Sequence, residues 1–235
     1  MTRTLRVSLI IAVTLLCAPA HAADKWVTSW IASVQGPYPV GNPSAQPVLK
    51  FAFPAPEAGA RDQTFRLILL PEIWGKQTRL RFSNAFGTRP VTLDGAYVGL
   101  QYGSATLMPG TNRPVTFGGK PSLTVEPGKD AWSDAVALPF VKDAKAPAGR
   151  KLAVSFHVAG ESGPMTWHAK ALQTSYVTAP GAGAKGQAED EARVPVFHRV
   201  LVLPRRRRHD GARRHQGDRH VRRLDHRRHR LDPER

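Results

Sequence analysis

The sequence has 235 residues, of which 41% are hydrophobic, and its formal net charge is +16. A charge of this size is typical of nucleic-acid-binding proteins, but half of the excess lies in Arg205–Arg235, which holds 13 arginines and five acidic residues. The charge therefore belongs to the end of the chain and predicts no specific nucleic-acid partner for the body. The single cysteine, Cys17, excludes a disulfide framework.

The N-terminus has the pattern of a secretory signal peptide. Arg3 and Arg6 precede an apolar run from Val7 to Cys17, and Ala20-His21-Ala22 supplies small residues for cleavage. The apolar run is too short to span a bilayer. We therefore predict a signal peptide at residues 1–22, a secreted or periplasmic mature chain, and no membrane association after cleavage.

Residues 23–180 have the pattern of an all-β domain. Short apolar stretches alternate with polar residues and are separated by Pro/Gly clusters such as Pro109-Gly110 and Pro127-Gly128. The predicted strands are Trp26–Ser33, Phe65–Leu70, Thr78–Ser83, Val91–Leu100, Ser122–Val125, Ala131–Leu138 and Leu152–Val158. No segment keeps a helical period for three turns. This spacing predicts an antiparallel β-sandwich, jelly-roll-like in type.

Two segments follow the predicted sandwich. Residues 181–199 begin with small and polar side chains and are predicted to be a linker or a long loop. Residues 200–235 form an Arg-rich tail without lysine or aromatic side chains. Such a composition predicts an unstructured segment or an isolated helix without a packed core.

The body contains residues of the types that serve as catalytic nucleophiles or metal ligands. Gly160-Glu161-Ser162-Gly163-Pro164 approaches the G-x-S-x-G pattern of a nucleophile elbow, but Pro164 stands at the last position and no helical pattern follows, so we predict a turn. Five acidic and histidine residues are scattered without metal-ligand spacing: Asp94, Asp130, Asp134, His157 and His168. We expect the two histidines to have structural roles. The sequence thus predicts no catalytic residue, no metal site and no cofactor.

Several long strings resemble the N-terminal extension of a bacterial family of secreted SGNH/GDSL hydrolases. They are WVTSWIAS (26–33), RLRFSNAFGTRPVTLDGAYVGL (79–100), PGTNRPVTFGGKPSLTV (109–125), WSDAVALP (132–139) and GPMTWHAKALQTSYVTAPG (163–181). The resemblance implies a β-sandwich placed before an α/β hydrolase domain. That domain opens with a strand leading into Gly-Asp-Ser, and it ends in Asp-x-x-His. Neither motif is present in this chain, so no catalytic residue is carried over.

The tail can be explained as the hydrolase domain read in another frame. Arg222–Glu234 can be encoded so that a shift by one nucleotide gives GDSITDGTGSTPN, which resembles the nucleophile block of the family. Val200–Asp210 can be shifted in the same way to give FWFFLGVDVM, which is one residue shorter than the corresponding family string. We therefore predict a frame change between about residues 193 and 200.

Two functions remain as hypotheses. In the first, the chain is the accessory domain of a secreted serine esterase that acts on acyl esters, including esterified carbohydrate, and it lacks the catalytic residues. In the second, it is a stand-alone secreted module that binds polysaccharide through surface aromatic side chains. The partner of the intact protein is accordingly an ester or a carbohydrate.

Overall fold

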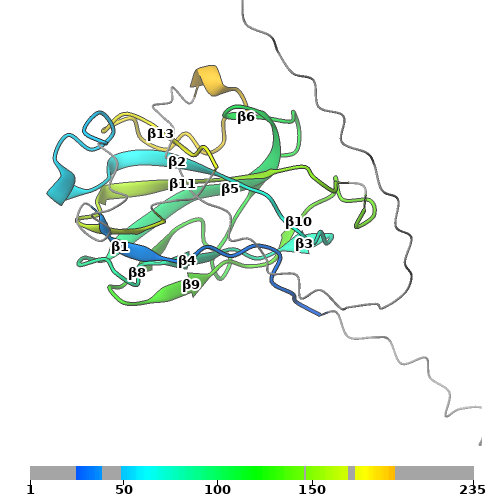
Figure 1. The fold of residues 1–235 in the computed structure, drawn as a ribbon, viewed down its shortest axis with the longest axis horizontal. Helices are drawn as coiled ribbons and strands as arrows, with labels where there is room; N and C mark the ends of the chain where they lie inside the picture. Colours follow the sequence, from blue (N-terminus) through cyan, green and yellow to red (C-terminus); the bar gives the residue numbers. More distant parts are fainter. Residues whose placement is uncertain (1–24, 39–48, 146, 169–172, 194–235) are drawn as a thin grey trace, which may run out of the picture. The chain divides into compact units, whose positions relative to one another are not determined.

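The computed structural model describes four stretches of the chain, residues 25–38, 49–145, 147–168 and 173–193 (Figure 1). Three of the predicted segments lie outside the described residues. They are the signal peptide at residues 1–22, the last part of the predicted linker at residues 194–199, and the Arg-rich tail at residues 200–235.

The described residues form an all-β, antiparallel, sandwich-like fold, which confirms the predicted fold class. The strands are β1 (Gln35–Tyr38), β2 (Arg61–Leu69), β3 (Gln77–Thr78), β4 (Arg81–Ser83), β5 (Val91–Gly103), β6 (Thr106–Leu107), β7 (Arg113–Pro114), β8 (Leu123–Val125), β9 (Asp130–Trp132), β10 (Val136–Ala137), β11 (Leu152–Glu161), β12 (Met165–Trp167) and β13 (Tyr176–Val177). Helical structure in the described residues is limited to two short 3₁₀ turns, Pro56–Ala58 and Glu191–Arg193.

The largest sheet has the order β13-β2-β11-β5-β6, and β7 and β8 also pair with β5. Figure 1 shows its three long strands, β2, β11 and β5, side by side. These strands carry the clearest alternation in the sequence, and they extend the predicted segments Phe65–Leu70, Val91–Leu100 and Leu152–Val158. Alternation places every second side chain on the same face of a sheet. On one face, Phe65 and Phe156 stack with ring centroids 5.4 Å apart.

Short strand pairs form the layer that packs on this face. They are β4 with β9, β3 with β10, and β1 with β12. Two hydrophobic clusters fill the space between the layers. One is centred on Trp74, Val98 and Val154, and the other on Tyr38, Phe53 and Leu93.

The predicted strands Thr78–Ser83 and Ala131–Leu138 are each divided in two. Arg81 pairs with Trp132, whereas Thr78 pairs with Val136, so one extra residue lies in the second segment between the two ladders. At this bulge the Ser133 hydroxyl accepts a hydrogen bond from the Leu80 amide, over 2.9 Å. A side chain replaces a backbone partner here, which interrupts the regular ladder.

The other face of the large sheet carries polar side chains beside a small hydrophobic cluster of Ile68, Leu107 and Ala153, and it is covered by the segment predicted to begin a linker. Lys185 donates its backbone N–H to the Thr64 hydroxyl, and Leu107 donates its backbone N–H to the Glu189 carbonyl, each over 2.8 Å. Gly186 approaches the sheet so closely that a Cβ there would lie 2.5 Å from the Gly95 carbonyl oxygen. Residues 181–193 are therefore a loop packed on the sandwich, and the domain continues past the predicted boundary at residue 180.

The Arg66 side chain connects this loop to the sheet through hydrogen bonds. Its side chain is fully buried, and the guanidinium donates to the Ser155 hydroxyl, the Ala105 carbonyl and the Ala188 carbonyl. Burial lowers the pKa of Arg66 to about 10, so the group stays charged at neutral pH. Each of the three guanidinium nitrogens thus has one acceptor, and none of these acceptors is a carboxylate.

The prediction of a strand at Trp26–Ser33 is wrong. The segment runs beside residues 70–73, where the Ser29 carbonyl accepts from the Glu72 amide and the Ser29 hydroxyl donates to the Ile73 carbonyl. No ladder forms, and Trp26, Trp30 and Ile31 remain exposed. The segment is rich in apolar side chains, but it lacks a neighbouring strand that could bury them.

None of the helical turns in the described residues is long and apolar enough to cross a membrane.

Candidate functional site: an interior cavity and a tryptophan–arginine ledge

The serine of the G-x-S-x-P string is a structural residue. Ser162 follows the last strand residue of β11, Glu161, and its side chain is 2% exposed. Its hydroxyl donates to the Gly163 carbonyl and accepts from the Ala60 amide, both over 2.9 Å. These backbone partners use the hydroxyl fully and hold the turn in place, so Ser162 has the structural role that the sequence predicts.

Neither of the two candidate histidines of the body is hydrogen-bonded to a serine hydroxyl among the described residues. His168 Nδ1 lies 2.7 Å from the Ser33 carbonyl, where it can donate a hydrogen bond. Two further serines have partners other than histidine: the Ser155 hydroxyl accepts from Arg66, and the Ser83 hydroxyl accepts from the Ala85 amide. A hydrolytic serine needs a general base within hydrogen-bond reach. Within the described residues, neither histidine provides one for a serine.

His157 lies between two carboxylates. Its Nδ1 is 2.5 Å from Asp94 Oδ1, and its Nε2 is 2.7 Å from Asp62 Oδ1. A β-bulge at Gly95, where φ is +47°, shifts the register of β5 against β11 and places Asp94 directly opposite His157. Asp62 could not be predicted as a partner of His157, because it lies on β2, far from both His157 and Asp94 in the chain. The imidazole is thus fixed at both nitrogens.

The remaining acidic candidates also stabilise the fold. Asp130 forms an ion pair with Arg81. Asp134 accepts hydrogen bonds from the Gly119 amide, the Thr116 hydroxyl and the Gly118 amide, and these bonds lower the pKa of its carboxyl group. No group of three histidine, cysteine or acidic side chains among the described residues is arranged to hold a metal ion.

An exposed ledge of tryptophan and arginine side chains lies at the layer of short strands. The Arg79 guanidinium lies 5.5 Å from the ring centroids of both Trp26 and Trp132, and that of Arg81 lies 5.9 Å from Trp132. Both tryptophans are 55% exposed. We call Trp26, Arg79, Arg81 and Trp132 the tryptophan–arginine ledge. Aromatic faces of this kind can stack on sugar rings, with arginine and carboxylate groups beside them as hydrogen-bonding partners.

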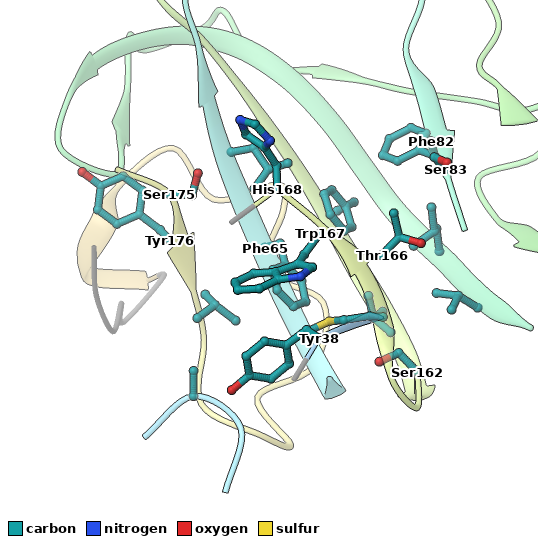
Figure 2. A pocket seen from close by; sticks show the side chains of 18 of the residues that line it. Tyr38, Phe65, Phe82, Ser83, Ser162, Thr166, Trp167, His168, Ser175 and Tyr176 are labelled. Carbon is teal, nitrogen blue, oxygen red and sulfur yellow. The ribbon is translucent and has the colours of Figure 1, made fainter. Parts of the chain in front are cut away.

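A cavity of about 460 Å³, partly open to solvent, is lined by side chains of both layers (Figure 2). Aromatic and aliphatic side chains dominate its lining, including Phe65 and Phe156 from the large sheet and Tyr38, Met165 and Trp167 from β1 and β12. No lysine, arginine, aspartate or glutamate lines it among the described residues. Its volume falls in the range of small-molecule sites, about 300–1,000 Å³.

The cavity is partly open to solvent, so water can enter it. Its largely apolar lining would suit an apolar ligand.

Most polar groups of the cavity lining already have protein partners. The Asn84 amide donates to the Arg89 and Val125 carbonyls, and the Thr166 hydroxyl accepts from the Phe86 amide. The Trp167 indole nitrogen is different: it is one of three buried side-chain polar atoms without a hydrogen-bond partner among the described residues. The other two belong to Trp74 and Asn112, which do not line the cavity.

Sequence reasoning missed the cavity, because its lining comes from strands that are distant in the chain. Among the tryptophans, Trp74 is buried, whereas Trp26, Trp30 and Trp132 are substantially exposed. No family model and no curated protein matches the chain.

Proposed function

We propose that the described part of the chain is the non-catalytic β-sandwich of a secreted SGNH/GDSL-type ester hydrolase, whose hydrolase domain lies in a different reading frame. In the intact protein, a serine would attack an acyl ester, a histidine would accept its proton, and an aspartate would orient the imidazole. Backbone and side-chain donors would stabilise the oxyanion.

The observation that carries this proposal is the shifted reading of the tail. Between the two family-like strings, Asp210–Val221 can be encoded so that the same shifted frame reads Met-Ala-Pro-Gly-Gly-Thr-Lys-Ala-Ile-Val-Thr-Phe. This string joins the two without a gap and leads directly into Gly-Asp-Ser. An apolar stretch followed at once by the nucleophile is the strand-and-turn context that a hydrolase serine requires.

The genetic code restricts how freely such a reading can be constructed. Each shifted codon takes two bases from one residue and one base from the next. At the junction of Leu224 and Asp225, for example, the shifted codon can encode only Leu, Ser or Trp, or a stop. A continuous open reading from Val200 to the end that also matches the family strings is poorly explained by coincidence.

The structure supports the proposal in two respects. The described serines and histidines do not form a nucleophile–base pair, in agreement with an accessory role for this part. In addition, the loop of residues 181–193 completes the sandwich, with Ala105 donating its amide to the Glu191 carboxylate. A further domain would thus begin close to the point at which the frame is proposed to change.

The genomic DNA after the codon for Arg193 provides the test. An open frame that encodes Gly-Asp-Ser and later Asp-x-x-His is expected one nucleotide away from the present frame. Stops or unrelated sequence in both other frames would overturn the proposal.

A second function, polysaccharide binding, is favoured by the tryptophan–arginine ledge. Exposed Trp26 and Trp132 on either side of Arg79 fit the stacking and hydrogen bonding that sugar rings require. Affinity electrophoresis in gels that contain soluble polysaccharides would detect such binding. We expect retardation of the chain that is lost in Trp132→Ala and retained in Trp74→Phe; equal mobility with and without polysaccharide would exclude this function.

A further inference from the structure

We infer that the tryptophan–arginine ledge binds acidic polysaccharides in preference to neutral ones. In this arrangement the terminal nitrogens of Arg79 hold the carboxylate of a uronate unit, and the ring of that unit or its neighbour packs on Trp132. The inference rests on the polysaccharide-binding function proposed for the ledge and names the class of polysaccharide that the ledge selects. It does not depend on how the tail is read.

The fold fixes the direction of the Arg79 side chain. Arg79 lies between β3 and β4, beside the bulge at Ser133, and its Nε donates to the Ser133 carbonyl over 3.2 Å. Its guanidinium lies 5.5 Å from the ring centroids of both Trp26 and Trp132, within the usual range of about 6 Å for a cation–π contact. The residue is nevertheless exposed. An exposed cation is thus held in place, which reduces the entropy that is lost when an anion binds to it.

The two terminal nitrogens of Arg79 have no acceptor among the described residues. Within that part of the chain its side chain forms one hydrogen bond, through Nε, and no ion pair. The charge of Arg79 acts on Asp134, but the Gly119 amide and the Thr116 hydroxyl contribute more to the lowered pKa of that carboxyl group. Both Asp134 oxygens already accept hydrogen bonds from these groups and from the Gly118 amide. The N–H groups of the two terminal nitrogens are therefore available to a ligand.

Arg81 differs from Arg79, although its guanidinium also lies near Trp132, 5.9 Å from the ring centroid. Its Nε donates to the Asp130 carboxylate over 3.2 Å, and its Nη2 donates to the same oxygen. These residues come from β4 and β9, which lie side by side (Figure 1). Asp130 thus neutralises Arg81, and Arg79 is the cation of the ledge that has no carboxylate partner among the described residues.

A uronate unit has groups that match both parts of the ledge. Its carboxylate can accept two parallel N–H bonds from one guanidinium, and such charge-assisted bonds are about twice as strong as neutral ones. Its ring has apolar faces that can pack on the exposed indoles of Trp26 and Trp132. A neutral sugar would pack on the indoles in the same way but would leave the Arg79 charge without a partner. The ledge therefore favours the acidic sugar.

A single-stranded nucleic acid also combines rings with negative charges, but it fits the ledge less well. Its affinity comes from many phosphate contacts along a positively charged groove. The ledge offers one unpaired cation among the described residues and carries the Asp130 carboxylate beside it. Such a site suits a sugar chain in which the carboxylates are separated by neutral units.

Isothermal titration calorimetry of the full chain tests the inference at physiological ionic strength, which screens long-range charge attraction. The probes are aldotetraouronic acid (a xylotriose that carries one methylglucuronate unit), its methyl ester and tetrathymidylate. We expect the acid to bind at least about ten-fold more tightly than the ester, which keeps the sugar rings and loses the charge. We also expect tetrathymidylate to bind more weakly than the acid.

The possible results separate this inference from the function on which it rests. Equal binding of the acid and its methyl ester would overturn the inference and leave polysaccharide binding intact. No saturable binding of either sugar would overturn the inference, whereas polysaccharide binding itself is decided by the gel retardation described above. Tighter binding of tetrathymidylate than of the acid would indicate a nucleic-acid site and would also overturn the inference.

Two arginine variants locate the carboxylate. Arg79→Gln removes the unpaired charge and should lower affinity for the acid at least about ten-fold, while affinity for the methyl ester changes by less than about two-fold. Arg150→Gln removes another exposed arginine, which does not belong to the ledge, and should leave both affinities unchanged. Equal losses of acid affinity in the two variants would show that net charge alone matters and would overturn the inference.

Asp130→Asn provides a gain of affinity that misfolding cannot imitate. The substitution removes the carboxylate partner of Arg81 next to Trp132. Affinity for the acid should therefore rise about two- to five-fold, and affinity for the methyl ester should stay the same. Circular dichroism and thermal unfolding establish that the variant is folded. Unchanged or lower affinity of folded Asp130→Asn for the acid would place the carboxylate away from the ledge and overturn the inference.

Discussion

Replacement of the buried Arg66 by methionine should destabilise the sandwich by about 3 kcal/mol. The guanidinium donates three hydrogen bonds, of 2.8 Å to Ser155 and 2.5 Å each to the Ala105 and Ala188 carbonyls. At about 2 kcal/mol for each bond to a charged group, their loss amounts to about 6 kcal/mol. The lowered pKa, about 10 instead of 12.5, indicates that burial of the charge costs about 3 kcal/mol, which the methionine variant recovers.

Thermal and urea unfolding of the full chain, followed by far-ultraviolet circular dichroism, measure this difference. For a domain of this size the melting temperature should fall by about 6–12 °C. Amide exchange adds a local readout, because the Leu107 amide, bound to the Glu189 carbonyl, should lose protection when the loop detaches. Exposed Arg150→Met serves as the control and should change the free energy of unfolding by less than about 0.5 kcal/mol. An Arg66→Met variant as stable as the unaltered chain would refute the reasoning.

Three further substitutions test individual contacts. Asp134→Asn should destabilise the chain above about pH 4, where the carboxylate is ionised in both the folded and the unfolded chain. The effect should shrink at lower pH, because the ionised carboxylate stabilises the fold only until the pH falls through the lowered pKa of the folded state. Urea unfolding across the acid range measures this change. Gly186→Ala, whose Cβ would lie 2.5 Å from Gly95 O, should lower stability by about 1–3 kcal/mol in the same assay, whereas Gly103→Ala, with open space around it, should not. His157→Phe should cost about 1–2 kcal/mol through loss of both carboxylate contacts, and unchanged stability would show that these contacts are solvent-screened.

The long strands could be predicted from the sequence because each has a buried face along most of its length. In β11, every second side chain belongs to or packs against one of the two hydrophobic clusters: Leu152, Val154, Phe156 and Val158. A strand of this kind shows a clear apolar–polar alternation in its sequence. The segment at Trp26–Ser33 has apolar residues without this regular alternation, its tryptophans stay exposed, and its prediction failed. Periodicity reports which side chains could share a face, but it does not report whether another strand is available to cover that face.

The candidate surfaces could not be predicted, because they depend on pairings across the chain. Trp167 lines the cavity with Phe65 and Phe156, which come from three separate strands. Likewise, the loop of residues 181–193 has the composition of a linker, but Arg66 and Thr64 hold it through its backbone carbonyls and amides. Backbone partners of this kind leave little trace in the side-chain sequence.

Hydrolysis of p-nitrophenyl acetate tests the central claim most directly, with three proteins compared: the chain as printed, its Ser162→Ala variant, and a chain continued in the shifted frame after about Arg193. The account predicts no turnover above background by the first two and clear turnover by the third, because only the shifted frame supplies a nucleophile, a base and an oxyanion site. Turnover by the printed chain that disappears in Ser162→Ala would contradict the account, as would an inactive but folded shifted-frame protein.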